Sequence, residues 1–482
     1  MYLGIDIGTS GVKVVALSDE GKVIAQQSAP LSVSRPRPLW SQQDPHDWWE
    51  ACNKAVLGLP ASLRADVQSV GLTGQMHGAV LLDSEDRPLR PAILWNDGRS
   101  HAECVELERR VPSSRTITGN IAMPGFTAPK LLWVAENEPE VFAATRKVLL
   151  PKDYIRLVMT GDTASDMSDS AGTLWLDTGK RAWSEAMLEA TGLSTSHMPQ
   201  LFEGTQATGN LLNDLATSWG MAPVPVAAGG GDNAAGAVGV GILGQSDALL
   251  SLGTSGVTFV ANSQFSPNPD GAVHAFCHCV PDTWHQMAVH LSAASCIDWG
   301  ARQLGVSDAA QFLSLAETAA PGSGPELFLP FLSGERTPHN DPHLRAGFLL
   351  CDGDTSPARL ASAVLEGVAF AHADGLAALR AAGSSVSRLS VIGGGSRSLH
   401  WGRILSAALD AELSYLDGGE VGPALGAARL ARVALTGEDP AAVCVAPPVK
   451  TVIQPDPELA AMLEPKLASY RAACRAIRFI KE

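Results

Sequence analysis

The chain contains 482 residues, of which 45% are hydrophobic and 18% charged, and its formal net charge is −15. This composition excludes an intrinsically disordered chain and predicts about two or three globular domains with a large apolar core. The acidic balance, without a long basic run, argues against nucleic acid as a partner. No run reaches about 18 uncharged apolar residues, so a membrane span is not expected either.

The N-terminus and the cysteines indicate the cellular compartment of the protein. The sequence MYLGIDIGTSG lacks the basic and long apolar regions of a secretory signal, and the eight cysteines are scattered like reduced cytosolic thiols. We therefore expect a cytoplasmic protein. In AVHAFCHCVP, His274, Cys277, His278 and Cys279 stand close together. A metal site is one interpretation of this run, but alternation along a strand is favoured because no second ligand pair lies nearby.

The first thirty residues consist of three apolar runs separated by turn residues, which predicts three antiparallel strands. Part of this pattern returns in the second half of the chain. IDIGTSGVKVV (5–15) and LSLGTSGVTFV (250–260) share GTSGV and the flanking apolar alternation, at an offset of 245 residues. This spacing, about half of the chain, predicts a duplicated architecture.

Each GTSG turn is predicted to join two strands as a hairpin that cradles phosphate. Glycine allows close approach of the backbone N–H groups, and the hydroxyls add donors. Thr9 and Ser10 of the first turn, and Gly253 and Thr254 of the second, are therefore expected to contact a polyphosphate. A pair of tight β-turns without a ligand is the alternative.

The two copies differ at one position that bears on chemistry. Asp6 of the first copy is replaced by Ser251 in the second. Only the first hairpin therefore brings a carboxylate to the phosphates, which suits a single Mg²⁺ held largely through waters. Lys13 either adds positive charge near the phosphates or faces solvent.

The stretch AAGGGDNAAGAVG (227–239) surrounds one carboxylate, Asp232, with glycine and alanine. It predicts a sharp strand-to-helix turn, at which Asp232 caps the helix, acts as a catalytic base, or does both. A helix N-terminus stabilises an ionised carboxylate, so the pKa of Asp232 is expected to be lowered.

Two further glycine clusters lie near the C-terminus. VIGGGSRS (391–398) predicts a strand, a glycine turn and a helix, with Gly394, Gly395 and Ser398 positioned to contact a nucleotide. A packing turn is the alternative. GGEVGPALGAARLA (418–431) predicts a glycine turn followed by a structural helix of small residues.

Five motifs in order resemble the FGGY carbohydrate kinases, members of the actin-like, duplicated ATPase superfamily. These are GIDIGTSGVKVV, GFTAPKLLWVAEN (125–137), ALLSLGTSGV (248–257), VIGGGSRS and AVLEGVAFA (363–371). The resemblance implies an α/β, ribonuclease H-like fold with a cleft between two domains. It assigns residues 1–243 to the sugar and the catalytic aspartate, and residues 244–482 mainly to ATP. It also suggests a homodimer.

Within the family, GQMHG (74–78) and GGGDNAAGAVG (229–239) match the branch that phosphorylates D-xylulose. The glycerol-kinase branch carries Arg-Glu where Met76 and His77 stand, and Asp-Gln where Asp232 and Asn233 stand. These departures favour a ketopentose. The resemblance thus implies transfer from ATP, with Mg²⁺, to D-xylulose, giving D-xylulose 5-phosphate. Asp232 is the implied base, Asp6 the metal-side carboxylate, and Met76, His77 and Asn233 are the implied sugar contacts.

Three alternatives stay open at the level of sequence. Ribulose, gluconate or a polyol is the competing substrate class, and a non-catalytic sensor on the same fold is the competing function. In LWNDGR, residues Trp95, Asp97 and Arg99 are lesser candidates for sugar contacts. The other interpretation of LWNDGR is a turn with an Asp–Arg pair on its surface.

Overall fold

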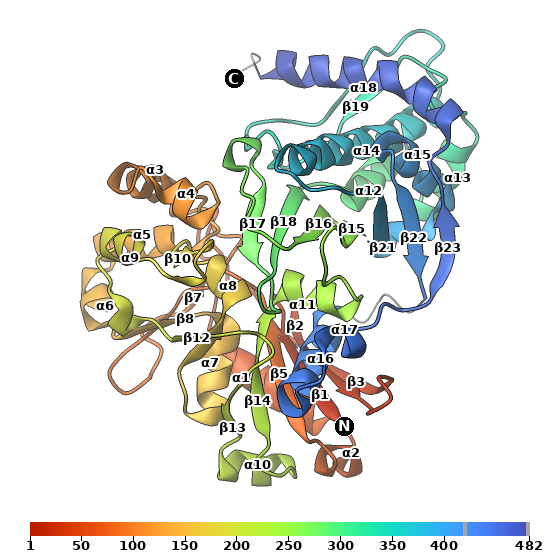
Figure 1. Cartoon of the computed structure of the whole chain (residues 1–482). Coiled ribbons are helices and arrows are strands. Elements are labelled where there is room, and N and C mark those ends of the chain that lie inside the picture. The colour runs from red at the N-terminus through yellow and green to blue at the C-terminus, as the bar shows by residue number, and fades with distance from the viewer. Residues whose placement is uncertain (418–421, 479–482) are drawn as a thin grey trace.

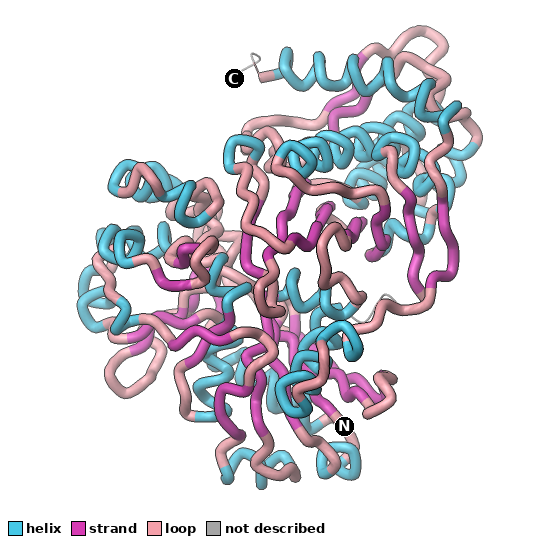
Figure 2. The backbone as a smooth tube through the Cα atoms, viewed as in Figure 1, coloured by secondary structure: helices cyan, strands magenta, loops and turns pink. Residues whose placement is uncertain are grey.

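The computed structural model describes residues 1–417 and 422–478. The chain forms two lobes, one built from the first half of the sequence and one mainly from the second (Figure 1). Each lobe has a mixed β-sheet with helices packed around it (Figure 2). The predicted α/β fold is confirmed. The glycine turn predicted over 418–421 lies outside the described residues.

The first sheet has six strands in the order β13-β14-β5-β1-β2-β3. The three predicted strands at the N-terminus are confirmed, because β1, β2 and β3 pair antiparallel in sequence order. β5 and β14 continue the sheet parallel to β1. The bounds are β1 (Tyr2–Ile7), β2 (Gly11–Leu17), β3 (Val23–Pro30), β5 (Ser69–Gly74), β13 (Ala207–Asn210) and β14 (Pro225–Gly231).

The second sheet has seven strands in the order β17-β18-β16-β15-β21-β22-β23. β15, β16 and β18 form an antiparallel series, and β21 and β22 continue parallel to β15. This is the arrangement of the first sheet, so the predicted duplication is present in the topology. The bounds are β15 (Ala248–Leu252), β16 (Gly256–Asn262), β17 (His274–Cys277), β18 (Trp284–His290), β21 (Arg388–Ile392), β22 (Glu412–Leu416) and β23 (Val449–Ile453).

Helices and short strand pairs complete both lobes. The helices are α1 (Pro45–Leu57), α2 (Ala61–Ala65), α3 (His101–Arg110), α4 (Ser114–Thr118), α5 (Thr127–Asn137), α6 (Pro139–Ala144), α7 (Pro151–Thr160), α8 (Met167–Ala171), α9 (Glu185–Ala190), α10 (Asn213–Trp219), α11 (Asp232–Gly239), α12 (Ala294–Gln303), α13 (Ala309–Glu317), α14 (Pro357–Ala381), α15 (Leu399–Leu409), α16 (Gly422–Thr436), α17 (Pro440–Val443) and α18 (Pro457–Ile477). The short pairs are β4 (Gln42–Gln43) with β7 (Ala92–Ile93), β6 (Val80–Leu82) with β8 (Lys147–Leu149), β9 (Ala164–Asp166) with β12 (Gln200–Phe202), β10 (Leu176–Asp177) with β11 (Ala182–Trp183), and β19 (Leu327–Leu329) with β20 (Gly347–Leu349).

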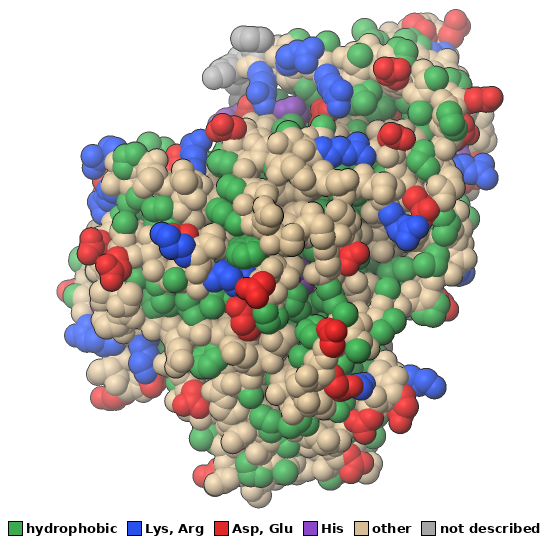
Figure 3. All heavy atoms as spheres, viewed as in Figure 1, with side chains coloured by type: hydrophobic (Ala, Val, Ile, Leu, Met, Phe, Trp, Pro, Cys, Tyr) green, Lys and Arg blue, Asp and Glu red, His purple; other side chains and the backbone are tan. Residues whose placement is uncertain are grey.

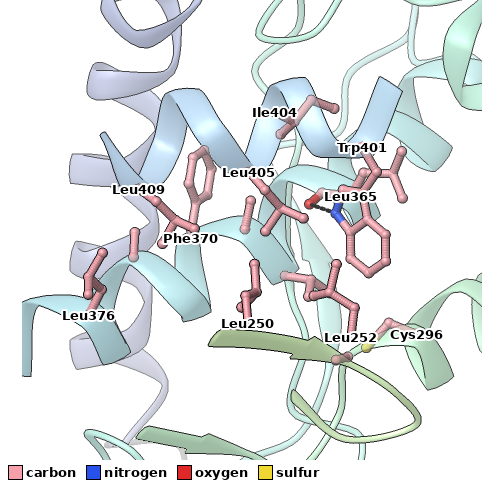
Figure 4. Packing of buried hydrophobic residues seen from close by; sticks show 14 of the residues in the cluster. Leu250, Leu252, Cys296, Leu365, Phe370, Leu376, Trp401, Ile404, Leu405 and Leu409 are labelled. Carbon is pink, nitrogen blue, oxygen red and sulfur yellow. Dashed lines mark hydrogen bonds between the residues drawn. The ribbon is translucent and has the colours of Figure 1, made fainter. Parts of the chain in front are cut away.

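Helix α14 is the central helix of the second lobe. Among the described residues it alone is long and apolar enough to cross a membrane, but 83% of its most apolar window is buried inside the fold. Figure 4 shows leucines of α14, α15 and β15 packed against one another. Trp401 of α15 donates its indole N–H to the carbonyl of Leu365 in α14, at 3.1 Å. α14 is therefore a core helix.

Helix α16 belongs to the second half of the chain but packs on the sheet of the first lobe (Figure 1). Glycines make this contact possible. A Cβ on Gly4 of β1 would lie 1.9 Å from the carbonyl oxygen of Ala424, and one on Gly426 would lie 1.8 Å from that of Ala235 in α11. The end of α11 is also held by Arg429, whose Nη1 donates to the carbonyl of Val238 at 3.1 Å. The two helices therefore join the lobes through backbone contact.

Replacing Gly426 with alanine should destabilise the protein. Alanine is favoured over glycine in a helix by about 1 kcal/mol, so helix propensity alone predicts a gain. The clash with the Ala235 carbonyl should reverse the sign and lower the free energy of unfolding by about 2 kcal/mol or more. Denaturant unfolding measures the change. The matched control is Gly353→Ala, where a Cβ meets no heavy atom within 4 Å; a Gly426→Ala protein as stable as this control would contradict the packing argument.

Candidate active site

A cavity of about 250 Å³ lies where the two lobes meet. It is lined from the first half by the loops after β5 and β7, the loop before α5, and the start of α11. From the second half it is lined by β16, β17, β18 and the loop that carries Arg336. The lining residues are Met76, His77, Trp95, Met123, Gly125, Phe126, Asp232, Asn233, Ser255, Val257, His274, Phe276, Met287, Val289 and Arg336. The cavity thus brings together Met76, His77, Asp232 and Asn233, which are far apart in sequence.

Asp6 stands at the end of β1, directly opposite Lys13 of β2. Residues opposite each other in an antiparallel pair project to the same face of the sheet, so the side chains of Lys13 and Asp6 lie on the same face. Burial and, to a smaller extent, the charge of Asp232 raise the pKa of Asp6 to about 7, although the charge of Lys13 opposes both. Asp6 Oδ1 is buried without a hydrogen-bond partner in the described structure. This carboxyl is therefore suited to a positively charged ligand.

The first GTSG turn is a hairpin, as predicted, closed by Gly8 N–H to the carbonyl of Gly11 at 3.1 Å. Thr9 was expected to offer its hydroxyl to phosphate, but Thr9 Oγ1 already donates to Gln75 Oε1 at 2.9 Å and accepts from the indole of Trp95 at 3.0 Å. Its carbonyl accepts from Gln43 Nε2 at 2.8 Å. The hairpin is therefore connected to the cavity wall through Trp95 and is held by Gln43 and Gln75.

The second GTSG turn is also a hairpin, joining β15 to β16. The start of α12 supports it, since Ala294 N donates to the carbonyl of Gly253 at 2.9 Å and Ser295 Oγ to that of Thr254 at 2.8 Å. Both backbone carbonyls are thus occupied, whereas the Thr254 side chain is exposed.

The GGG turn packs on this second hairpin. Gly393 has a positive φ of 90°, and a Cβ there would lie 2.8 Å from the Leu252 carbonyl. Gly394 faces open space. A short 3₁₀ turn (Gly394–Arg397) precedes α15, whose N-cap is Ser398 with Oγ accepting from Trp401 N at 3.2 Å. The predicted order of strand, glycine turn and helix is confirmed, with α15 beginning at Leu399 directly after VIGGGSRS, and Ser398 has a capping role of its own.

Asp232 is the first residue of α11, and Gly231 is the N-cap. The prediction that Asp232 caps the helix is therefore wrong. Its Oδ1 instead accepts from the backbone N–H of Asn233 at 2.8 Å and from Asn233 Nδ2 at 2.9 Å. Burial raises the pKa of Asp232 to about 6 against these hydrogen bonds. The predicted lowering is also wrong, because desolvation of the carboxylate outweighs the stabilisation at the helix N-terminus.

The three glycines before Asp232 serve backbone packing. Gly229 has φ 75°, and a Cβ on it would lie 1.7 Å from the carbonyl of Leu72 in β5. A Cβ on Gly231 would lie 2.9 Å from the side chain of Met76. The glycines therefore let β14 approach β5 and bring Asp232 beside Met76.

His77 is held in a left-handed conformation, φ 69°, with its Nδ1 at 2.6 Å from the carbonyl of Gly172. A carbonyl only accepts, so Nδ1 carries the proton and Nε2 is left as an acceptor. Burial lowers the pKa of His77 to about 3, which keeps it neutral near pH 7. Lys130 holds the loop that carries His77 against the loop before α5, because its Nζ donates to the carbonyls of His77 at 2.7 Å and Gly125 at 2.8 Å.

A fully buried ionic cluster lies behind the Asp232 turn, and sequence reasoning did not single it out. Lys152 Nζ lies 2.8 Å from Asp166 and 3.4 Å from Asp169. Ser168 Oγ donates to Asp166 and accepts from Gly231 N at 3.1 Å, which links the cluster to the residue before Asp232. The available signal was the presence of charged residues within the predominantly apolar run LLPKDYIRLVMTG (149–161) and of two aspartates in SDMSDSAGT (165–173).

The structure bears on two stretches for which the sequence left two interpretations open, LWNDGR and AVHAFCHCVP. The side chains of Asp97 and Arg99 are 0% and 1% exposed, so their ion pair is internal and the surface interpretation is wrong. In the AVHAFCHCVP run, His274 faces Asn120 whereas His278 Nε2 lies 3.1 Å from the Ile242 carbonyl. No group of three potential metal-ligating side chains occurs among residues 1–417 and 422–478. His274 instead lines the cavity, a role that the sequence did not indicate.

Family models for the N-terminal and C-terminal domains of the FGGY family of carbohydrate kinases match residues 1–239 and 248–435. The chain belongs to this family. It is 53% identical to the xylulose kinase of Escherichia coli K12 over 475 residues, 98% of either chain.

Solved structures agree with the family assignment. A "xyloylose kinase" from Brucella ovis superposes with a TM-score of 0.97 at 48% identity, covering 100% of both chains. A xylulose kinase from Rhodospirillum rubrum superposes with a TM-score of 0.91 at 26% identity, covering 99% of both. The fold is thus the duplicated, actin-like fold expected, and this FGGY kinase is an ATP-dependent carbohydrate kinase.

Lys130→Met should destabilise this FGGY kinase, because it removes the donor to the buried carbonyl of Gly125 and leaves that of His77 with only the longer hydrogen bond from Thr127 Oγ1, at 3.2 Å. The expected loss in free energy of unfolding is about 1–3 kcal/mol, measured by denaturant titration. Lys180→Met is the matched control, since Lys180 is 81% exposed and pairs only with Asp177. Equal stability of the two variants would show that Lys130 does not support the loop.

Proposed function

We propose that this kinase transfers the γ-phosphoryl group of ATP to D-xylulose and releases D-xylulose 5-phosphate. The observation that carries the proposal is the cavity between the lobes, which is lined by the Asp232 carboxyl, by the Arg336 guanidinium and otherwise by uncharged side chains. A cavity of about 250 Å³ is large enough for a five-carbon sugar. The similarity to xylulose kinases over the whole chain supports this choice of sugar.

In this proposal Asp232 is the general base. Its carboxylate orients the attacking hydroxyl and accepts the proton as the oxygen bonds to phosphorus. The hydrogen bonds from Asn233 to Oδ1 leave Oδ2 for the sugar. With a pKa of about 6, Asp232 is ionised near neutral pH yet is a better proton acceptor than an exposed carboxylate.

The sugar is proposed to lie against Met76, with His77 and Asn233 as polar contacts. His77 Nε2 accepts from a hydroxyl because Nδ1 is committed to Gly172. The exposed amide of Asn233 provides both a donor and an acceptor beside the base. Polar contacts of this kind disfavour substrates that leave them unpaired.

The two hairpins and the GGG turn are proposed to bind ATP, with backbone N–H groups and hydroxyls on the phosphates and bare glycine backbone under the nucleoside. Lys13 adds positive charge at the first hairpin, where it lies opposite Asp6. The proposed ATP contacts are Thr9, Ser10, Lys13, Gly253, Thr254, Gly394, Gly395 and Ser398. Thr9 is proposed to act through its backbone N–H, because its hydroxyl is hydrogen-bonded to Gln75 and Trp95.

Mg²⁺ is proposed to act with ATP beside Asp6. The fit rests on the buried, unpartnered Asp6 Oδ1 and on a pKa raised to about 7, both of which a nearby cation would relieve. A divalent cation bound to the phosphates would neutralise their charge during transfer. We also propose a cytoplasmic location, since all eight cysteines are free thiols.

The function is tested by incubating the protein with ATP, Mg²⁺ and D-xylulose and identifying the phosphorylated sugar by ³¹P NMR and mass spectrometry. Asp232→Asn should lower kcat by about 10²–10⁴-fold while ATP binding is retained. Asp247→Asn removes the same charge at an exposed position and should leave kcat unchanged. EDTA should stop transfer in the wild type, and added Mg²⁺ should restore it. Absence of D-xylulose 5-phosphate, or full activity of Asp232→Asn, would contradict the proposal.

The pH profile gives an independent test of the base. Protonation of Asp232 removes the proton acceptor, so kcat/KM should fall about tenfold per pH unit below a pKa of about 6 and level off above it. The hydrogen bond from Asn233 Nδ2 lowers this pKa. Asn233→Ala should therefore move the acidic limb to higher pH. A profile that is flat from about pH 5 to 8 would exclude Asp232 as the titrating base.

A further inference from the structure

Arg336 places a positive charge in the cavity wall that the mechanism above does not use. It lies in the loop between β19 and β20 and is partly buried. Other arginines with little exposure have partners: Arg99 pairs with Asp97 and Arg359 with Glu326. In residues 1–417 and 422–478, no hydrogen bond or salt bridge reaches the Arg336 guanidinium. Its guanidinium donors are therefore available to a ligand in the cavity that Arg336 lines.

The loop holds Arg336 in place through both neighbours. Glu335 Oε1 accepts from the backbone N–H groups of Leu291 at 2.9 Å and Arg336 at 2.8 Å. Thr337 Oγ1 accepts from Val289 N at 3.0 Å and donates to the Ala272 carbonyl at 2.8 Å. The backbone at Arg336 is thus anchored beside β17 and β18, and burial of its guanidinium without a hydrogen-bond partner is costly. A fixed, unpaired and partly desolvated cation indicates a ligand that supplies the acceptors.

Arg336 stands away from the catalytic carboxyl. A Cβ on Gly125 would lie 4.0 Å from Arg336 Nη2, which places the guanidinium over the loop before α5. Its charge contributes to the lowered pKa values of His77 and His274, both of which are neutral. Burial and the hydrogen bonds of the Asp232–Asn233 turn, by contrast, govern the pKa of Asp232. The cavity therefore has a base at one end and a guanidinium at the other.

The chemistry of the sugar explains why a donor is needed there. A 2-ketopentose closes its five-membered ring through the C5 hydroxyl, so that hydroxyl is free for phosphorylation only in the open-chain form. The open chain carries its C2 carbonyl and C1 hydroxyl at the end remote from C5. Two adjacent oxygen acceptors match the planar fork of a guanidinium.

We propose that Arg336 is the specificity-determining residue for the carbonyl end of the substrate, and that it also lets the cavity bind five-carbon sugar acids. This inference rests on the proposed function for its assignment of the C5 hydroxyl to Asp232. A pentonate carries a carboxylate where the ketose carries its carbonyl and C1 hydroxyl. The carboxylate forms a charge-assisted, bidentate pair with Arg336, so the acid competes with the ketose.

The test compares Arg336→Met and Arg336→Lys with the wild type, using D-xylulose as substrate and D-xylonate and xylitol as inhibitors. Arg345→Met is the matched control, because Arg345 is an exposed arginine of the same loop that contacts only backbone carbonyls. Arg336→Met should raise the KM for D-xylulose about tenfold or more while kcat changes less than about threefold. D-Xylonate should inhibit the wild type competitively with the ketose, and Arg336→Met should weaken it about thirtyfold or more. Inhibition by neutral xylitol should change less than about threefold, and Arg336→Lys should retain part of the D-xylonate binding.

Melting temperature and the KM for ATP report whether each variant is folded, and Arg336→Gln replaces the methionine variant if the latter unfolds. An unchanged KM for D-xylulose, or equal weakening of D-xylonate and xylitol, would overturn the inference. If the wild type does not phosphorylate D-xylulose, the proposed function fails separately. Calorimetric titration of D-xylonate into the wild type and Arg336→Met then still decides the role of Arg336, because equal affinities would exclude it.

Discussion

The structure depends on the direct contact of helices α11 and α16 with each other and with the first sheet. The contact is possible only because glycine stands at Gly4, Gly71 and Gly426, where a Cβ would lie within 2.0 Å of a backbone oxygen. α11 starts at Asp232, and α16 comes from the other half of the chain. The contact therefore sets the position of Asp232 relative to both lobes and to the two GTSG hairpins.

Beside this contact, the cavity between the lobes is lined by the charged side chains of Asp232 and Arg336 among mostly uncharged ones. Asp6 and Asp232 are both desolvated, and the charge of Asp232 further opposes ionisation of Asp6, so the pKa of Asp6 is about 7 and that of Asp232 about 6. The buried Lys152 cluster supports the turn from behind, and Lys130 supports the facing loop. Charge is interspersed on the outer surface, as acidic and basic side chains alternate over the face shown in Figure 3. The carboxyls of Asp6 and Asp232, by contrast, are buried, and the low dielectric constant of the protein interior strengthens their electrostatic interactions.

Much of the architecture could be predicted from local patterns. The meander of β1 to β3, the GTSG hairpins and the duplication depend on alternation and turn residues that lie within a few positions of one another. The electrostatics of Asp232 could not be predicted in this way. The helix N-terminus is a local feature that lowers a pKa, but burial by residues remote in sequence outweighs it. The hydrogen bonds of the Thr9 hydroxyl could not be predicted locally either, because its partners Gln75 and Trp95 come from two other loops.

By itself, then, the sequence determined the family, the repeat, the order of the motifs and the identity of the carboxylates, because these depend on residue type and spacing along the chain. Only the tertiary structure decided which side chains face the cavity, which are already hydrogen-bonded and which are desolvated. It turned the Asp97–Arg99 pair inward and brought His274 to the cavity wall. It also placed Arg336 in the cavity wall without a hydrogen-bond partner among the described residues. These properties depend on distances between chain segments that burial brings together, and no local pattern encodes them.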